Sequence, residues 1–180
     1  MNEPGDAPPP LVVVMGVSGC GKSTVCRLLA VLLHATFVEG DELHPPDNVA
    51  RMAAGVPLTD DDRSGWLLTI AARLAAARAA GQPLVVSCSA LKRSYRELLR
   101  SAAADLAFVH VHGERALLEA RMSARVDHFM PPSLLASQLQ ALEPPGADER
   151  AATFDAALPP TLIAAEAAAW LAGLSTSSAS

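Results

Sequence analysis

Residues 11–24 read LVVVMGVSGCGKST, an apolar run that leads directly into a glycine-rich loop. Within it, residues 16–23 match G-x-x-x-x-G-K-S, the pattern of a phosphate-binding loop between a buried strand and a helix. Glycines let such a loop curve with its N–H groups inward, Lys22 can reach the terminal phosphates, and the Ser23 hydroxyl can ligate Mg²⁺. A chance match would need three glycines, a lysine and a hydroxyl in register. The segment therefore predicts a nucleoside triphosphate site formed by Gly16, Val17, Ser18, Gly19, Cys20, Gly21, Lys22, Ser23 and Thr24.

The composition fits one domain in a reducing compartment. The chain has 180 residues, of which 51% are hydrophobic, enough for a sizeable core. Its net charge of −5 argues against a basic surface for nucleic acid. The three cysteines have no C-x-x-C spacing, and no apolar run reaches the roughly 18 residues of a membrane span. The N-terminus lacks the basic start and apolar core of a secretory signal, so we expect a cytoplasmic protein.

Periodicity and turn residues divide the chain into alternating strands and helices. We expect a proline-rich, disordered lead-in at residues 1–10, one domain at 11–173 and a flexible, serine-rich tail at 174–180. Strands are predicted at residues 11–15, 35–38, 84–87, 106–111 and 152–155. Helices are predicted at residues 23–33, 46–54, 63–80, 91–103, 114–125, 131–142 and 161–171. This alternation predicts a three-layer α/β fold with a central parallel sheet of about five strands and helices on both faces.

Polar residues follow the predicted strands, and in a parallel sheet the carboxyl ends of the strands share the edge where ligands bind. Asp41 follows the second strand, so its carboxylate can accept a proton from a substrate hydroxyl or hold that hydroxyl in line with the γ-phosphate. A turn-forming aspartate after Gly40 is the alternative. Glu39 is either a water-mediated ligand of Mg²⁺ or a solvated strand end.

Cations stand in the first turns of two predicted helices, where the helix dipole disfavours them. Arg63 follows the acidic residues 60–62, which suit a helix start after Thr59, and it suggests an anionic partner such as a substrate carboxylate. Lys92 and Arg96 stand four residues apart on one helix face, so they can grip an anion together. A solvated basic face is the alternative reading of this pair.

A second arginine pair, Arg121 and Arg125, ends the helix predicted at residues 114–125. Arginines that lead into a loop suit a lid that closes over phosphates, although favourable capping of the helix end explains them as well. The histidines at positions 34, 110 and 112 fit core or strand-end positions, and no His, Cys or Asp set has transition-metal spacing.

Several of these segments together resemble the small gluconokinases, which share a superfamily with shikimate and nucleoside-monophosphate kinases. The phosphate loop alone indicates only an NTPase, but the combination of GD-x-LHP, PL-x-DDDR-x-x-W and CSALK-x-x-YR is typical of gluconokinases. The resemblance covers most of residues 11–155. It is carried by MGVSGCGKST (15–24), GDELHP (40–45), NVARMAAGVPLTDDDRSGWL (48–67), CSALKRSYRELLR (88–100) and ARVDHFMPPSLLASQLQALEPP (124–145).

The resemblance implies a P-loop kinase that uses ATP and Mg²⁺ to phosphorylate D-gluconate on its 6-hydroxyl. It also implies a homodimer, a substrate-binding segment at about residues 41–65 and a lid at about residues 121–132. Asp41 would orient or deprotonate the 6-hydroxyl, and the catalytic set would be Lys22, Asp41, Arg121 and Arg125. The substrate-binding set would be Asp41, His44, Arg63, Ser89, Lys92, Tyr95, Arg96 and His128.

Two positions depart from the resemblance, and two rival functions stay open. Glu39 stands where relatives often have Asp, and Cys20 replaces a commoner small polar residue of the loop. The nearest rival is a kinase of the same fold for another small metabolite such as shikimate. The other is a GTPase-like switch, because residues 62–65 match D-x-x-G, but they follow an acidic run and the chain has no N-K-x-D.

Overall fold

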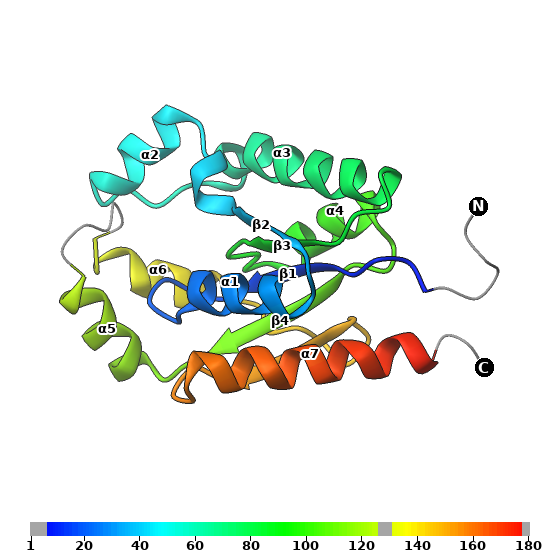
Figure 1. Ribbon diagram of the computed structural model, residues 1–180. Coiled ribbons are helices and arrows are strands. Elements are labelled where there is room, and N and C mark those ends of the chain that lie inside the picture. The colour runs from blue at the N-terminus through cyan, green and yellow to red at the C-terminus, as the bar shows by residue number, and fades with distance from the viewer. Residues whose placement is uncertain (1–6, 126–130, 178–180) are drawn as a thin grey trace.

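The computed structural model describes residues 7–125 and 131–177, in which helices cover both faces of one parallel sheet (Figure 1). The strand order is β2-β3-β1-β4-β5, and every neighbouring pair is parallel. This architecture confirms the predicted three-layer α/β fold. The strands are β1 (Leu11–Met15), β2 (Thr36–Glu39), β3 (Leu84–Ser87), β4 (Ala107–His112) and β5 (Ala151–Asp155).

The helices lie close to their predicted positions. They are α1 (Lys22–Leu32), α2 (Pro46–Ala53), α3 (Asp60–Ala79), α4 (Arg93–Ala102), α5 (Arg115–Ala124), α6 (Leu134–Ala141) and α7 (Pro160–Ser177). A short 3₁₀ helix, η1 (Gly40–Leu43), follows β2 and was absent from the prediction. No helix within residues 7–125 and 131–177 is both long and apolar enough to span a bilayer.

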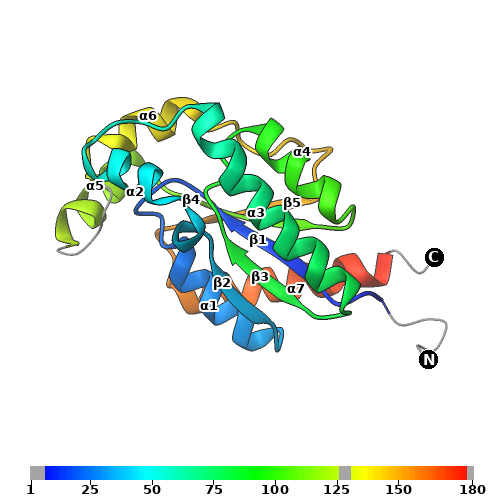
Figure 2. The same cartoon turned by 90° about the horizontal axis from the view of Figure 1, so that it is seen from above.

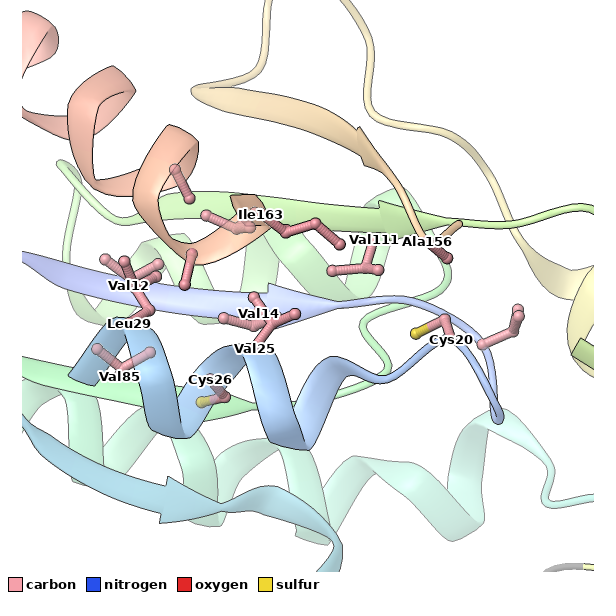
Figure 3. Close-up of a cluster of buried hydrophobic side chains, with 14 of the residues drawn as sticks. Val12, Val14, Cys20, Val25, Cys26, Leu29, Val85, Val111, Ala156 and Ile163 are labelled. Carbon is pink, nitrogen blue, oxygen red and sulfur yellow. The ribbon is translucent and has the colours of Figure 1, made fainter. Parts of the chain in front are cut away.

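The central strand β1 explains why an uninterrupted apolar run opens the domain. All five of its residues are buried, because both of its faces are covered. Val12 and Val14 pack in a cluster with Leu29 of α1 and Ile163 of α7 (Figure 3). The alternate residues of β1 pack in a second cluster with residues of α3 and α4, which lie on the other side of the sheet (Figure 2).

The start of α3 follows the predicted capping logic. The Thr59 hydroxyl accepts a hydrogen bond from the Asp62 N–H at 3.2 Å, and the Asp62 carboxylate accepts one from the Thr59 N–H at 2.8 Å. This capping box gives Asp62 a structural role. The D-x-x-G match at residues 62–65 therefore lies inside a helix, not in the loop after a strand.

Both ends of the described chain are more ordered than the sequence suggests. The carbonyl oxygens of Pro9 and Pro10 accept hydrogen bonds from Arg78 Nη1 and the Leu84 N–H. Helix α7 runs to Ser177, beyond the predicted end at residue 171 and into the predicted flexible tail. The Thr176 hydroxyl donates to the Gly173 carbonyl oxygen at 2.8 Å, so a polar side chain supports the helix end instead of fraying it.

Candidate active site

The phosphate-binding loop connects β1 to α1 at the carboxyl edge of the sheet. Gly16 has φ +149°, and a Cβ there would lie 2.6 Å from the Val111 carbonyl oxygen and 2.7 Å from Cys20 Sγ. No side chain fits at that point without moving β4. Gly21 takes φ +88° as the N-cap of α1, a left-handed conformation that glycine adopts at little cost. The sequence pattern thus corresponds to backbone geometry that only glycine supports.

Lys22 begins α1 and is 8% exposed. Burial by itself would lower its pKa, but nearby negative groups, Asp41 foremost and Glu39 after it, outweigh burial and raise the pKa. The ammonium group therefore stays charged at neutral pH. The same electrostatic interactions place Asp41 and Glu39 close to the phosphate loop.

The end of β2 is fixed against β3, and this sets the position of Asp41 in η1. A Cβ on Gly40 would lie 2.0 Å from the Ser87 carbonyl oxygen, so only glycine allows the two chains to approach so closely. Trp66 Nε1 donates to the Gly40 carbonyl oxygen at 2.7 Å. The Ser87 hydroxyl donates to the Glu39 carboxylate, so Glu39 is not simply a solvated strand end.

His44 lies beyond η1 with its ring stacked on Trp66 at 4.1 Å between centroids. Burial lowers the pKa of His44 to about 4, so the ring is neutral at physiological pH. Asn48 Nδ2 lies 3.4 Å from His44 Nδ1 and also donates to the Asp62 carbonyl oxygen. Because an amide nitrogen only donates, Nδ1 accepts and the ring proton lies on Nε2, which makes Nε2 a donor.

Arg63, Lys92 and Tyr95 come together around the carboxylate of Asp60. Lys92 Nζ lies 2.9 and 3.0 Å from its two oxygens, and the Tyr95 hydroxyl donates to it as well. Arg63 Nη1 lies 3.3 Å from the Tyr95 hydroxyl oxygen. The hydrogen bonds from Lys92 and Tyr95 lower the pKa of Asp60. Lys92 and Tyr95 are thus the donors to Asp60, whereas Arg63 Nη1 donates to the Leu58 carbonyl oxygen at 2.7 Å and to the Tyr95 hydroxyl.

Arg96, predicted to share an anion with Lys92, is placed elsewhere by the structure. Its side chain is completely buried, and its guanidinium forms a bidentate ion pair with the buried Glu149. Its remaining nitrogen, Nη1, donates to the carbonyl oxygens of Ala90 and Leu91. The four-residue spacing of Lys92 and Arg96 is as predicted. However, Glu149 lies 53 residues from Arg96 along the chain, so no local sequence pattern indicates that the two residues pair.

Arg121 and Arg125 lie beside the phosphate loop. Arg121 Nη2 donates to the Ala156 carbonyl oxygen at 2.8 Å. Both arginines line a cavity of about 360 Å³ together with Gly21, Thr24 and Pro160. Arg125 is exposed just beyond α5. The predicted site residue His128, like lid residues 126–130 as a whole, lies outside the described residues.

Gln138 of α6 is a contact of the phosphate loop that the sequence analysis missed. Its Oε1 accepts from the Ser18 N–H at 2.8 Å, and its Nε2 donates to the Ser18 hydroxyl at 3.0 Å. Both residues are buried. A lone glutamine in an amphipathic helix carries no local signal of such a role.

Oxygen ligands for a magnesium ion are available at the loop. Ser23 follows Lys22 in the first turn of α1 and is partly exposed, and the carboxylates of Asp41 and Glu39 lie nearby. In the part of the chain that the structure describes, no three His, Cys, Asp or Glu residues form a metal-binding group. A hydroxyl beside bound phosphates fits a hard cation that keeps several waters.

Comparison with known proteins gives consistent matches over most of the chain. The AAA domain family matches residues 11–145. The gluconokinase of Gluconobacter oxydans is 52% identical over 141 residues, which is 78% of this chain and 79% of that protein. The crystal structure of a gluconokinase from Sinorhizobium meliloti is 50% identical, with a TM-score of 0.85 over 96% of this chain and 97% of the other. An unliganded sugar kinase from Janibacter is 43% identical, with a TM-score of 0.88 over 91% and 95%.

Proposed function

The chain belongs to the gluconokinase family, and on that basis we propose that it transfers the terminal phosphoryl group of ATP to D-gluconate. The acceptor is the 6-hydroxyl, and the products are 6-phospho-D-gluconate and ADP. The shikimate alternative is not favoured, because the relatives at 50–52% identity are named gluconokinases.

One structural observation supports this function above the others: a phosphate-binding loop and a carboxylate-binding cluster are linked through a single row of polar residues. Lys22 interacts electrostatically with Asp41, and Asp41 interacts with His44. His44 in turn interacts with Arg63, which contacts Tyr95. A site for the phosphates of ATP and a site for a small hydroxylated anion would therefore lie side by side at the carboxyl edge of the sheet.

The nucleotide would bind on the side of α1 and α5. The N–H groups of residues 16–24 would hold its phosphates. The buried, charged Lys22 would neutralise negative charge on the β- and γ-phosphate oxygens. The cavity beside the loop has an apolar side formed by Ala156, Pro160 and Ile163, which suits a purine base. Arg121 and Arg125 line the same cavity and would contact phosphate charge there.

Ser23 would hold Mg²⁺ through its hydroxyl, with the remaining positions taken by phosphate oxygens and water. The ion, when bound, neutralises charge on the transferring phosphoryl group. Glu39 would act on it only through water, because its carboxylate accepts the hydrogen bond of Ser87.

The gluconate would bind between η1, α3 and α4. Arg63, Lys92 and Tyr95 would bind its carboxylate in place of Asp60, since Lys92 and Tyr95 already donate to the Asp60 carboxylate and Arg63 contacts Tyr95. His44 Nε2 and the Ser89 hydroxyl would bind sugar hydroxyls, as a neutral ring with a defined proton can. His128 stays a prediction from the resemblance.

Once both substrates are bound, phosphoryl transfer chiefly requires that the acceptor hydroxyl is aligned with the γ-phosphate. Asp41 would accept a hydrogen bond from the 6-hydroxyl and hold its oxygen in line with the γ-phosphorus. The new O–P bond forms as the bond from the γ-phosphorus to the bridging oxygen breaks, and the hydroxyl proton passes to Asp41 or to solvent. Lys22 stabilises the negative charge that develops on ADP.

We also propose that the protein is a cytoplasmic homodimer. The cytoplasmic location is supported by the three cysteines, which are buried free thiols, as in proteins of reducing compartments. Val31 and Leu32, at the end of α1 beside the edge strand β2, are 73% and 51% exposed, and they offer apolar surface for a second copy. Light scattering after gel filtration tests this point, and a monomer at micromolar concentration would contradict it.

Product identification tests the reaction directly. The purified protein is incubated with Mg-ATP and D-gluconate, and the product is examined by ³¹P NMR and mass spectrometry. A phosphomonoester coupled to the C6 methylene protons is the expected result. A phosphate on another hydroxyl would contradict the placement of Asp41, and release of inorganic phosphate alone would indicate an ATPase.

A further inference from the structure

The turn at residues 88–92 carries two of the proposed gluconate ligands in an unfavourable backbone conformation. It joins β3 to α4 and includes Ser89 and Lys92. Ala90, fully buried at its centre, has φ +44°, in the left-handed region that residues with a Cβ seldom adopt. Such a conformation persists only when its surroundings hold it. The Ser89 carbonyl oxygen also accepts from the Gly16 N–H at 3.3 Å, so the turn contacts the phosphate loop directly.

Arg96 holds this turn from the inside. Its Nη1 donates to the carbonyl oxygen of Ala90 at 2.9 Å and to that of Leu91 at 3.2 Å. These are the carbonyl oxygens of the left-handed residue and of the residue after it. A single planar guanidinium can reach both because its geometry is rigid.

Glu149 in turn fixes Arg96. Its carboxylate accepts from Arg96 Nε at 2.7 Å and from Nη2 at 3.1 Å, and its side chain is 1% exposed. Arg100 and Arg93 lie 3.8 and 4.0 Å from the same carboxylate. A charge buried among three arginines, immediately before β5, is a costly feature that packing alone does not require.

We infer that Arg96 and Glu149 are positioning residues for the acceptor substrate, which keep the turn at residues 88–92 in the conformation that presents Ser89 and Lys92 to gluconate. The inference rests on the proposed function. Because both side chains are buried, we expect the pair to act without contacting substrate or nucleotide. Its influence passes through the backbone of Ala90, so loss of the pair should weaken gluconate binding more than ATP binding.

The test compares Arg96→Lys with Arg115→Lys, the same substitution at a side chain of α5 that is 62% exposed and pairs with Glu119. Lysine cannot pair with Glu149 and also hold both carbonyl oxygens. We expect Arg96→Lys to raise the KM for gluconate about ten-fold or more, with a much smaller change in the KM for ATP. Arg115→Lys should leave both constants at the wild-type values. Circular dichroism confirms that each variant is folded at the assay temperature, and Glu149→Gln replaces Arg96→Lys if that variant does not fold.

A rescue separates positioning from general stability. Glycine adopts the left-handed conformation freely, so adding Ala90→Gly to Arg96→Lys should recover at least part of the gluconate KM without restoring the melting temperature. An unchanged KM in the folded Arg96→Lys variant, an equal rise in Arg115→Lys, or a failed rescue would each overturn the inference. Failure of the proposed function is distinct, because the wild-type protein would then show no turnover with gluconate.

Discussion

Among single residues, Asp41 has the most specific assigned role, because its position depends on contacts that fix the backbone around it. Gly40 packs against Ser87 with no room for a side chain, and Trp66 binds the Gly40 carbonyl oxygen. The carboxylate that follows is thereby held near Lys22. An aspartate that only formed a turn would not need these buried contacts of the residue before it.

Asp41→Asn should therefore lower kcat by at least about 100-fold, because the amide can neither accept the hydroxyl proton nor orient the hydroxyl equally well. The affinity for ATP should stay close to the wild-type value. Steady-state kinetics and nucleotide titration measure the two quantities. Glu42→Gln, an exposed neighbour in η1, is the matched control and should behave as wild type. An unchanged kcat in Asp41→Asn would assign the acceptor hydroxyl to another residue.

Arg63→Ala should raise the KM for gluconate about ten-fold or more and change kcat little. A hydrogen bond to a substrate carboxylate far from the reacting oxygen contributes equally to the ground and transition states. The control is Arg51→Ala, which removes the same positive charge at a more exposed arginine that pairs with Asp62. If the two variants had the same KM for gluconate, Arg63 would belong to the surface and not to the site.

At the scale of elements, the contact between α6 and the phosphate loop links two segments that lie 120 residues apart. Gln138 binds both the N–H and the hydroxyl of Ser18, and it does so from the helix that follows the predicted lid. The side chain therefore ties the conformation of the loop to the position of α6.

Gln138→Leu keeps the approximate shape of the side chain and removes both hydrogen bonds to Ser18. We expect the KM for ATP to rise about 30-fold, since the two lost bonds are each worth about 1 kcal/mol in a buried site. Gln140→Leu, on the exposed face of the same helix, should leave the KM for ATP unchanged. Equal ATP kinetics in the two variants would show that α6 does not influence the loop.

The elements themselves were largely predictable, because each has a local signal. An apolar run, a G-x-x-x-x-G-K-S motif and a Thr59–Asp62 capping box identify β1, the phosphate loop and the start of α3. Two features had no local signal. The 3₁₀ helix η1 depends on the long-range packing of Gly40 on Ser87, and the last turns of α7 depend on polar groups that sequence patterns associate with tails.

The positions of Lys22 and Asp41 beside each other at the carboxyl edge of the sheet were predictable, because each follows a strand with a clear apolar signal. The site was not predictable where a distant partner decides the role. Arg96 has the spacing of an anion ligand, yet Glu149, two residues before β5, pairs with it. Only the assembled fold brings such a partner into contact.

For the molecule as a whole, two buried histidines should make stability depend on pH. Burial lowers the pKa values of His44 and His110 to about 4, from an ordinary value of 6.5. Between these values the unfolded chain binds protons that the folded protein excludes, so stability falls as the pH drops from 6.5 towards 4 and is unaffected above 6.5. Melting temperatures measured from pH 7.5 to pH 5 should show this fall.

The double variant His44→Gln and His110→Gln should flatten the dependence in that window, because neither side chain then titrates. Carboxylates with lowered pKa values, such as those of Asp60 and Asp148, act below the window and do not interfere. An equally steep fall in the double variant would show that other groups control acid stability.

The central claim is that the phosphate loop serves a gluconate site beside it, and the rate of ADP release tests this claim most directly. A coupled assay with Mg-ATP compares D-gluconate with shikimate, glucose and no acceptor, with Lys22→Ala as the inactive control. We expect the turnover rate with gluconate to exceed the rate with every other acceptor. Turnover should be lost in Lys22→Ala, because this variant lacks the ammonium group that binds the ATP phosphates. Turnover with shikimate or glucose but not with gluconate would contradict the account.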